Sequence, residues 1–181
     1  MVRIDDGGKN GSVSVSNTQR LDVSARSADR TYYESRDEGS VYTLSIEDAG
    51  AVANEETVWL KNTSTTKDMI IDTISIGSVA ITTWRLKFAT FTTQPTGTTV
   101  TATNLNRASS NTAAAECLGG AAGVSNVIDG PTIAFFNCDA GSETIWDTKE
   151  ALRLGQDDQI AIECETSGDV LITIEFHFDS E

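Results

Sequence analysis

The sequence predicts an all-β protein: an antiparallel β-sandwich, jelly-roll-like, with an extended N-terminal arm. Three observations support this fold class. Apolar and polar residues alternate with a period of two in most segments after residue 40. Stretches rich in Gly, Asn, Asp, Ser and Thr separate these segments every ~8–12 residues, as turns do in sandwiches and barrels. No segment has the longer apolar period of a helix, which argues against an α/β fold.

The body of the protein begins with a strand predicted at Val41–Ile46, where apolar and polar residues alternate. A hairpin is predicted next, in which a polar turn joins Thr57–Lys61 to Met69–Ile76. Val58 and Leu60 share the face of its first strand that we expect to be buried. A single hairpin is not stable in water, so this apolar face requires further strands.

A second hairpin is predicted from Trp84–Phe91 to Val100–Thr103, because the stretch between them contains a turn with Pro and Gly. Alternation in the first of these strands assigns each side chain to a face. Phe88 is expected on the inner face, and Arg85 and Lys87 on the outer face.

The following segments are less regular. Asn104–Asp129 is the least strand-like part of the body, although Thr112–Leu118 favours a short strand over a single helical turn. Thr132–Asn137 is apolar on both faces, which is typical of a buried strand. Shorter segments are expected at Val79–Ile81, Ile145–Trp146 and Lys149–Leu154.

A third hairpin is predicted at the end of the chain, from Gln159–Glu165 to Val170–Phe178, with Ser and Gly in its turn. Cys164 lies in phase with two inward isoleucines, so we expect it to be a small core residue. His177 lies on the face opposite to the inward phenylalanines, where we expect a hydrogen-bonded or exposed side chain.

Two parts of the chain differ in composition and charge. Residues 1–36 form the predicted arm, and residues 37–181 form the β-sandwich domain. The arm carries six basic and five acidic residues, and the total charge is −14, so the domain carries −15. A polar arm of this kind is expected to become ordered only against a neighbour. The acidic domain repels polyanions, so nucleic acid and membranes are not expected as partners.

Cysteine usage and the start of the chain both indicate synthesis in a reducing compartment. Cys117, Cys138 and Cys164 are widely spaced and show no disulfide pattern. None of them lies at a zinc-ligand spacing from another cysteine or from His177. The first residues are charged and rich in Gly, so no signal peptide is expected. No segment has the ~20 apolar residues that a membrane-spanning helix needs.

No group of side chains has the pattern of a catalytic site. His177 stands on a regular strand, where a Ser–His–Asp arrangement is not expected. Glu163 and Glu165 are expected on an exposed strand face as solvated charges. Calcium at Asp5–Asp6 or Asp157–Asp158 is a minor alternative, because neither pair resembles a calcium-binding loop. We therefore predict no enzyme activity, no metal site and no cofactor.

Five stretches together resemble a group of small, β-rich virion structural proteins of tailed bacteriophages. They are Tyr32–Glu38, Trp59–Ser64, Asn104–Ala113, Leu152–Glu163 and Ile172–Phe178. The resemblance implies a jelly-roll-like module that is made in the host cytoplasm and assembles on a capsid or tail. The chain departs from many such proteins in being strongly acidic.

We therefore expect a capsid decoration or cement protein that binds the assembled shell as a homo-oligomer, with a trimer as one option. Its partners would be other copies of itself and the major capsid protein or another virion protein. Arm residues expected to contact these partners are Arg20, Arg26, Arg30, Tyr32, Tyr33 and Arg36.

Two alternative functions stay open. The first is a tail or fibre-associated virion protein that meets the host. The second is a carbohydrate-binding jelly-roll module, for which Trp59 and Trp146 are the conceivable aromatic platforms, although packing within or between chains is the favoured role of both side chains.

Overall fold

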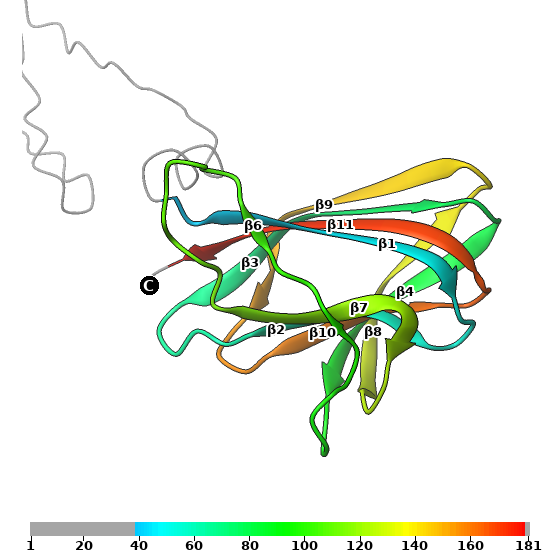
Figure 1. Cartoon of the computed structure of the whole chain (residues 1–181), viewed down its shortest axis with the longest axis horizontal. Coiled ribbons are helices and arrows are strands. Elements are labelled where there is room, and N and C mark those ends of the chain that lie inside the picture. Colours follow the sequence, from blue (N-terminus) through cyan, green and yellow to red (C-terminus); the bar gives the residue numbers. More distant parts are fainter. Residues whose placement is uncertain (1–38, 180–181) are drawn as a thin grey trace, which may run out of the picture.

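A computed structural model of the chain describes residues 39–179 (Figure 1). These residues fold into strands and connecting turns without a helix, and the strands form two packed antiparallel sheets. The all-β sandwich predicted from the sequence is confirmed. The arm predicted at residues 1–36 lies outside the described residues.

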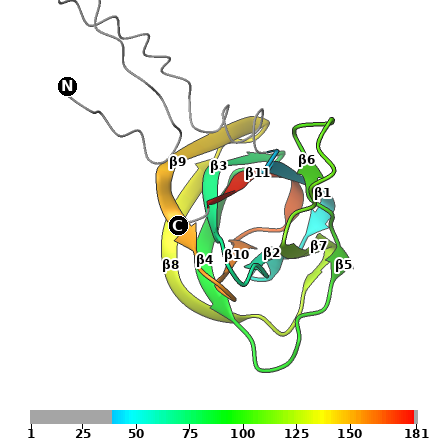
Figure 2. The ribbon, with the colours of Figure 1, turned by 90° about the vertical axis from the view of Figure 1, so that its left-hand side faces the viewer.

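The first sheet has the strand order β6-β1-β11-β3-β9. Its strands are β1 (Val41–Ala51), β3 (Asp68–Ser78), β6 (Thr103–Asn104), β9 (Ser142–Leu154) and β11 (Gly168–Asp179). The second sheet has the order β5-β7-β2-β10-β4-β8. Its strands are β2 (Glu56–Asn62), β4 (Thr82–Thr90), β5 (Thr98–Thr99), β7 (Ala115–Val124), β8 (Ile128–Cys138) and β10 (Gln159–Cys164). Figure 2 shows the two sheets enclosing the core, viewed from one end.

The strand order is that of a jelly roll. Strands β1 to β4 alternate between the two sheets, and so do β8 to β11. This alternation produces the four-stranded halves β1-β11-β3-β9 and β2-β10-β4-β8, which face each other across the core. The short strands β5 and β6 and the longer β7 extend the two sheets beside β2 and β1.

The three predicted hairpins are wrong, although most of their strands exist. Strands β2 and β3 lie in different sheets, as do β10 and β11, and β4 pairs with β10 and β8 rather than with the next strand along the chain. Strands β5 and β6 replace the strand predicted at Val100–Thr103. The reason is that the two sheets lie only ~10 Å apart, so a short polar loop can lead from one sheet to the other as easily as to the next strand of the same sheet. The apolar face of each strand is then buried against the opposite sheet.

The alternation of side chains is confirmed in the core. Val58 and Leu60 are fully buried between the sheets, and so is Cys164. An aromatic cluster fills the core near the start of β1, where the rings of Tyr42 and Phe176 stack with centroids 5.7 Å apart. The strand favoured at Thr112–Leu118 corresponds to β7, so the helical turn is excluded.

Three expectations at the sheet margins are wrong. The segment Thr132–Asn137 belongs to β8, an edge strand with mostly exposed residues rather than a doubly buried one. Phe88 keeps its place in the alternation, opposite Ile160 of β10, but it is 41% exposed rather than buried. Val79–Ile81 forms the turn between β3 and β4, and both end residues are exposed.

Candidate functional site

The six arm residues predicted to contact partners all lie outside the described residues. Their role therefore stays a prediction. The structure describes the chain from Gly39 onward and the surfaces of the sandwich.

The arm joins the sandwich at Gly39, which side chains from the loop after β6 hold in place. The Gly39 carbonyl oxygen accepts hydrogen bonds from Asn104 Nδ2 at 2.8 Å, Asn111 Nδ2 at 3.3 Å and Ser109 Oγ at 3.4 Å. Gly39 has φ +60°, and a Cβ added there would lie 2.5 Å from Ser109 Oγ. Only glycine therefore fits this position. We call Asn104, Ser109 and Asn111 the root clamp.

The root clamp is itself fixed to β1. Strand β6 pairs with β1 through Asn104 and Tyr42, and the backbone N–H of Leu105 donates to the Val41 carbonyl at 2.9 Å. Asn104 Oδ1 accepts the N–H of Asn106 at 2.8 Å, so the same side chain also shapes its own turn. In the sequence, the stretch Asn104–Ala113 stands out only because it resembles phage virion proteins. Its Asn and Ser content indicates side-chain-to-backbone bonding, but it does not reveal a partner 65 residues away.

A groove of about 510 Å³ crosses the outer face of the first sheet at the end opposite the root clamp. Its floor contains Gly77, whose missing side chain leaves a hollow between Leu171 and Glu143. The groove is lined by Glu47, Asp48, Ser75, Gly77, Ser78, Val79, Gly141, Ser142, Glu143, Asp169, Val170, Leu171 and Thr173.

The groove combines acidic and apolar side chains. Glu47, Glu143 and Asp169 are exposed at its rim, and its lining contains no lysine or arginine. Leu171 is 60% exposed, and the neighbouring Ile145 is 62% exposed. Exposed apolar side chains that lie together on a sheet face are typical of protein-contact surfaces, and the carboxylates favour a cationic partner.

His177 is buried rather than exposed, although it points away from the main core as predicted. Its Nδ1 lies 2.9 Å from Asp72 Oδ2 and 3.1 Å from Oδ1, and the side chain has no exposed surface. The β-bulge between β11 and β3 brings Asp72 under the ring. The expectation of a hydrogen-bonded histidine is correct, and the option of an exposed one is wrong.

A buried charge network lies on the outer face of the second sheet. Lys87 Nζ lies 2.5 Å from Asp129 Oδ2 and also forms an ion pair with Glu163. Arg85 bonds Glu163 at 2.6 Å and also pairs with Glu165. Lys87 and Glu163 are 6% and 4% exposed, so the expectation of a solvated Glu163 is wrong. The residue is on the predicted face, but its partners and neighbouring strands cover it.

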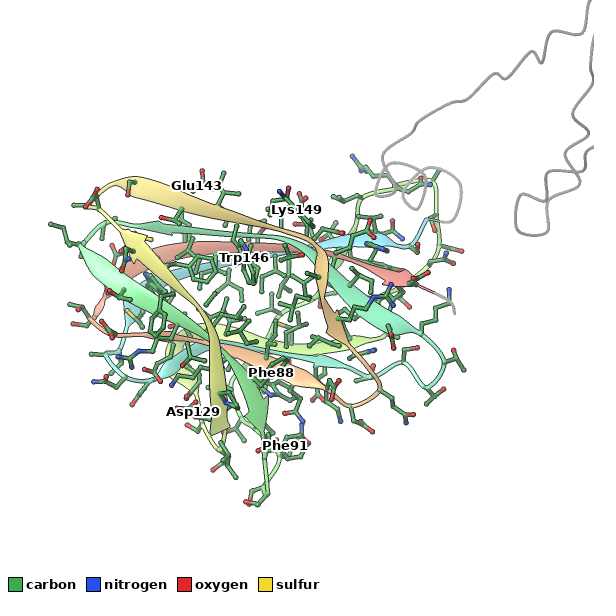
Figure 3. The ribbon with its side chains drawn as sticks, turned by 180° about the vertical axis from the view of Figure 1, so that it is seen from behind. Phe88, Phe91, Asp129, Glu143, Trp146 and Lys149 are labelled. Atoms are coloured by element: carbon green, nitrogen blue, oxygen red, sulfur yellow. The ribbon has the colours of Figure 1, made fainter. Side chains whose placement is uncertain are left out.

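Glu56 extends this network and holds a proton near neutral pH. Its pKa is raised from the ordinary 4.5 to about 7, mainly by burial and also by a hydrogen bond with Asp129 and by the nearby Asp129 charge, while a backbone hydrogen bond and Lys87 partly offset the rise. Ligand oxygens of Glu56, Asp129 and Glu163 all lie within 4.8 Å of one another. Figure 3 shows Asp129 on β8. Lys87 already supplies a positive charge to this group.

The two proposed aromatic platforms pack inside the protein. Trp59 is fully buried, its Nε1 donates to Gln159 Oε1 at 2.9 Å, and its ring packs edge-on against Phe91. Trp146 is half-buried between the sheets against Phe136, with ring centroids 6.0 Å apart (Figure 3). Packing is thus the role of Trp59 in this structure, because a second apolar cluster covers the outer face of the second sheet.

The acidic pair Asp157–Asp158 makes contacts within the protein, and the three cysteines are buried. Asp157 forms an ion pair with Lys61 at 2.7 Å, and Asp158 accepts the N–H of Gly155 at 2.9 Å within the turn. All three cysteines are free and buried. Burial raises the pKa of Cys117 to about 12, so its thiol is a poor nucleophile.

Comparison of the chain with models of protein families, with curated proteins and with solved structures finds no match. Within residues 39–179 there is no helix that is long and apolar enough to span a membrane.

Proposed function

We propose that the protein is a non-enzymatic structural protein of a tailed-bacteriophage virion, a capsid decoration protein that binds the assembled shell as a homo-oligomer. The observation that carries this proposal is the outer face of the first sheet, where exposed Ile145 and Leu171 border an acidic groove. The five stretches that resemble phage virion proteins supply the virion context.

The root clamp supports a role for the arm in assembly. Fixing Gly39 with three side chains holds one end of the arm at a defined point on the sandwich. A segment that is held at one end loses less conformational entropy on binding than a free segment does. Its binding is therefore opposed by a smaller entropic cost. Several copies in one oligomer then multiply weak contacts with a repetitive shell.

The test is co-sedimentation of the purified protein with capsids that lack it, followed by negative-stain imaging. We expect the native chain to sediment with the capsids and to be visible on their surface. Leu171→Asp should reduce occupancy at least tenfold, because it places a charge on the adhesive face and weakens the multivalent contact. Phe135→Asp is the matched control, since Phe135 is 63% exposed on the edge strand of the other sheet.

Three results would contradict the proposal. The first is native protein that does not sediment with capsids. The second is an equal loss of capsid occupancy for Leu171→Asp and Phe135→Asp. The third is density on tails instead of heads, which would favour the tail-associated role. Deleting residues 2–30 adds a test of the arm, because unchanged occupancy would remove it from the mechanism.

A further inference from the structure

The shape of the groove selects an extended partner segment. Glu47, Leu171, Gly77 and Glu143 occupy one register row across four adjacent strands, β1, β11, β3 and β9. Neighbouring strands lie ~4.8 Å apart, so the carboxylates at the two ends of this row are separated by about 14 Å. The hollow at Gly77 lies between them, and the nearest atom to a Cβ added there would be 3.8 Å away.

The charge of the chain disfavours a second sandwich domain as the occupant and favours the arm. Residues 37–181 carry −15, so two of these acidic faces repel each other, whereas residues 1–36 carry +1 and four arginines lie between residues 20 and 36. The first of these arginines belong to the sequence Arg-Leu-Asp-Val-Ser-Ala-Arg at residues 20–26.

We propose that the groove binds the segment Arg20–Arg26 from the arm of a second copy of the chain. In an extended conformation, Leu21, Val23 and Ala25 lie on one side and face the apolar floor. Arg20 and Arg26 lie at the two ends of this segment, ~20 Å apart, on the side of the extended chain away from the floor, and their long flexible side chains bend around the edges of the segment to reach the carboxylates at the two ends of the row. Ion pairs at the rim set the register of the segment, and burial of its apolar side chains stabilises it.

The reach of the arm is sufficient for exchange between copies. Arg26 lies 13 residues before Gly39, so the connection spans up to about 43 Å when extended, which is more than the length of the 11-residue strand β1. The root clamp and the groove lie at opposite ends of the first sheet, as the course of β1 in Figure 1 shows. An arm that leaves one copy at its root clamp and enters the groove of the next links copies head to tail. This inference rests on the homo-oligomer in the proposed function and names its contact.

The experiment is sedimentation velocity of the full-length chain without capsids. Two variants each damage one side of the contact: Arg20→Glu with Arg26→Glu alters the arm, and Gly77→Leu fills the hollow. We expect the native chain to associate and each variant alone to associate at least tenfold more weakly. An equimolar mixture should regain association, because the intact arm of one variant meets the intact groove of the other. Gly50→Leu is the control, since nothing lies within 4 Å of a Cβ there.

Several outcomes would overturn the inference. One is a native chain that sediments as a monomer, which would place the arm on its own groove or on none. Variants that form species of the same mass as the native chain would also overturn it, as would a mixture of the two variants that does not regain association. The last is association of the native chain that stays unchanged when the salt concentration rises from about 0.05 M to about 0.5 M. Capsid occupancy is measured separately. Occupancy that persists when the arm contact fails leaves the decoration role standing, whereas association without occupancy refutes only that role.

Discussion

Replacing Glu56 with Gln should make the protein more stable at alkaline pH and leave it unchanged at acidic pH. The Glu56 carboxyl is half-buried beside Asp129, and its pKa is raised to about 7 from 4.5. Because the folded chain holds this proton more tightly than the unfolded chain, the free energy of unfolding falls as the pH rises from about 4.5 to about 7. The full loss is present above about pH 7. Gln imitates the protonated side chain and cannot lose this proton.

The magnitude follows from the size of the pKa change. The difference between 4.5 and about 7 corresponds to at most about 3 kcal/mol, and partial exposure to water reduces this to about 2 kcal/mol. We therefore expect Glu56→Gln to exceed the native chain in the free energy of unfolding by about 2 kcal/mol at pH 8 and by less than about 0.5 kcal/mol at pH 4.5.

The assay is urea denaturation of both proteins at several pH values between these limits. Other groups that titrate in this range contribute equally to the two proteins, so their effects cancel in the difference. Glu55→Gln, at an exposed neighbouring position, should keep the native pH dependence. A native chain and a Glu56→Gln variant with the same dependence on pH would show that the carboxyl pair does not share a proton, and would refute the reasoning.

Three further predictions concern the other buried groups. Lys87→Met leaves Glu163 with Arg85 as its remaining cationic partner and should lower the free energy of unfolding by about 1.5–3 kcal/mol at neutral pH; a loss below about 1 kcal/mol would contradict a buried ion pair. Gly39→Ala, at φ +60° and against the root clamp, should cost about 1–3 kcal/mol, whereas Gly50→Ala in open space should change stability by less than about 0.5 kcal/mol; equal effects in denaturation would argue against the clamp. Burial raises the pKa of Cys117 to about 12, so we expect an aromatic disulfide reagent at about pH 8 to modify this thiol only as fast as the chain opens, and immediate modification of the folded protein would show that the thiol is accessible.

The alternation in the sequence predicts correctly which side chains share a face of a strand, but it does not predict what packs against that face. It placed Val58 and Leu60 in the core and Trp59 on the opposite face, as the structure has them. It did not reveal that the opposite face of the second sheet is also covered. The alternation therefore predicts more exposure for Trp59 and Glu163 than the structure shows, because a period of two separates two faces but does not show what packs on either.

The candidate sites depend on residues that are far apart in the chain. Asn104 reaches Gly39 across 65 residues, and Lys87 reaches Glu163 across 76. The groove requires four strands in register, with Gly77 in the middle of one of them. None of these contacts follows from local spacing, because each is created by the order in which the strands pair.

By itself the sequence determined that the chain forms strands, which side chains share a face, and how the charge divides between an acidic domain and a mildly basic arm. Those properties are local, since they depend on the pleat of a strand and on the composition of each part. The pairing of distant strands is not a local property: β1 to β4 and β8 to β11 enter the two sheets in turn, and this arrangement buries His177 and Lys87 and forms the groove. The physical reason is that a strand can satisfy its backbone hydrogen bonds with any partner, whereas the choice among partners is made by how the apolar faces of the whole chain close around one core.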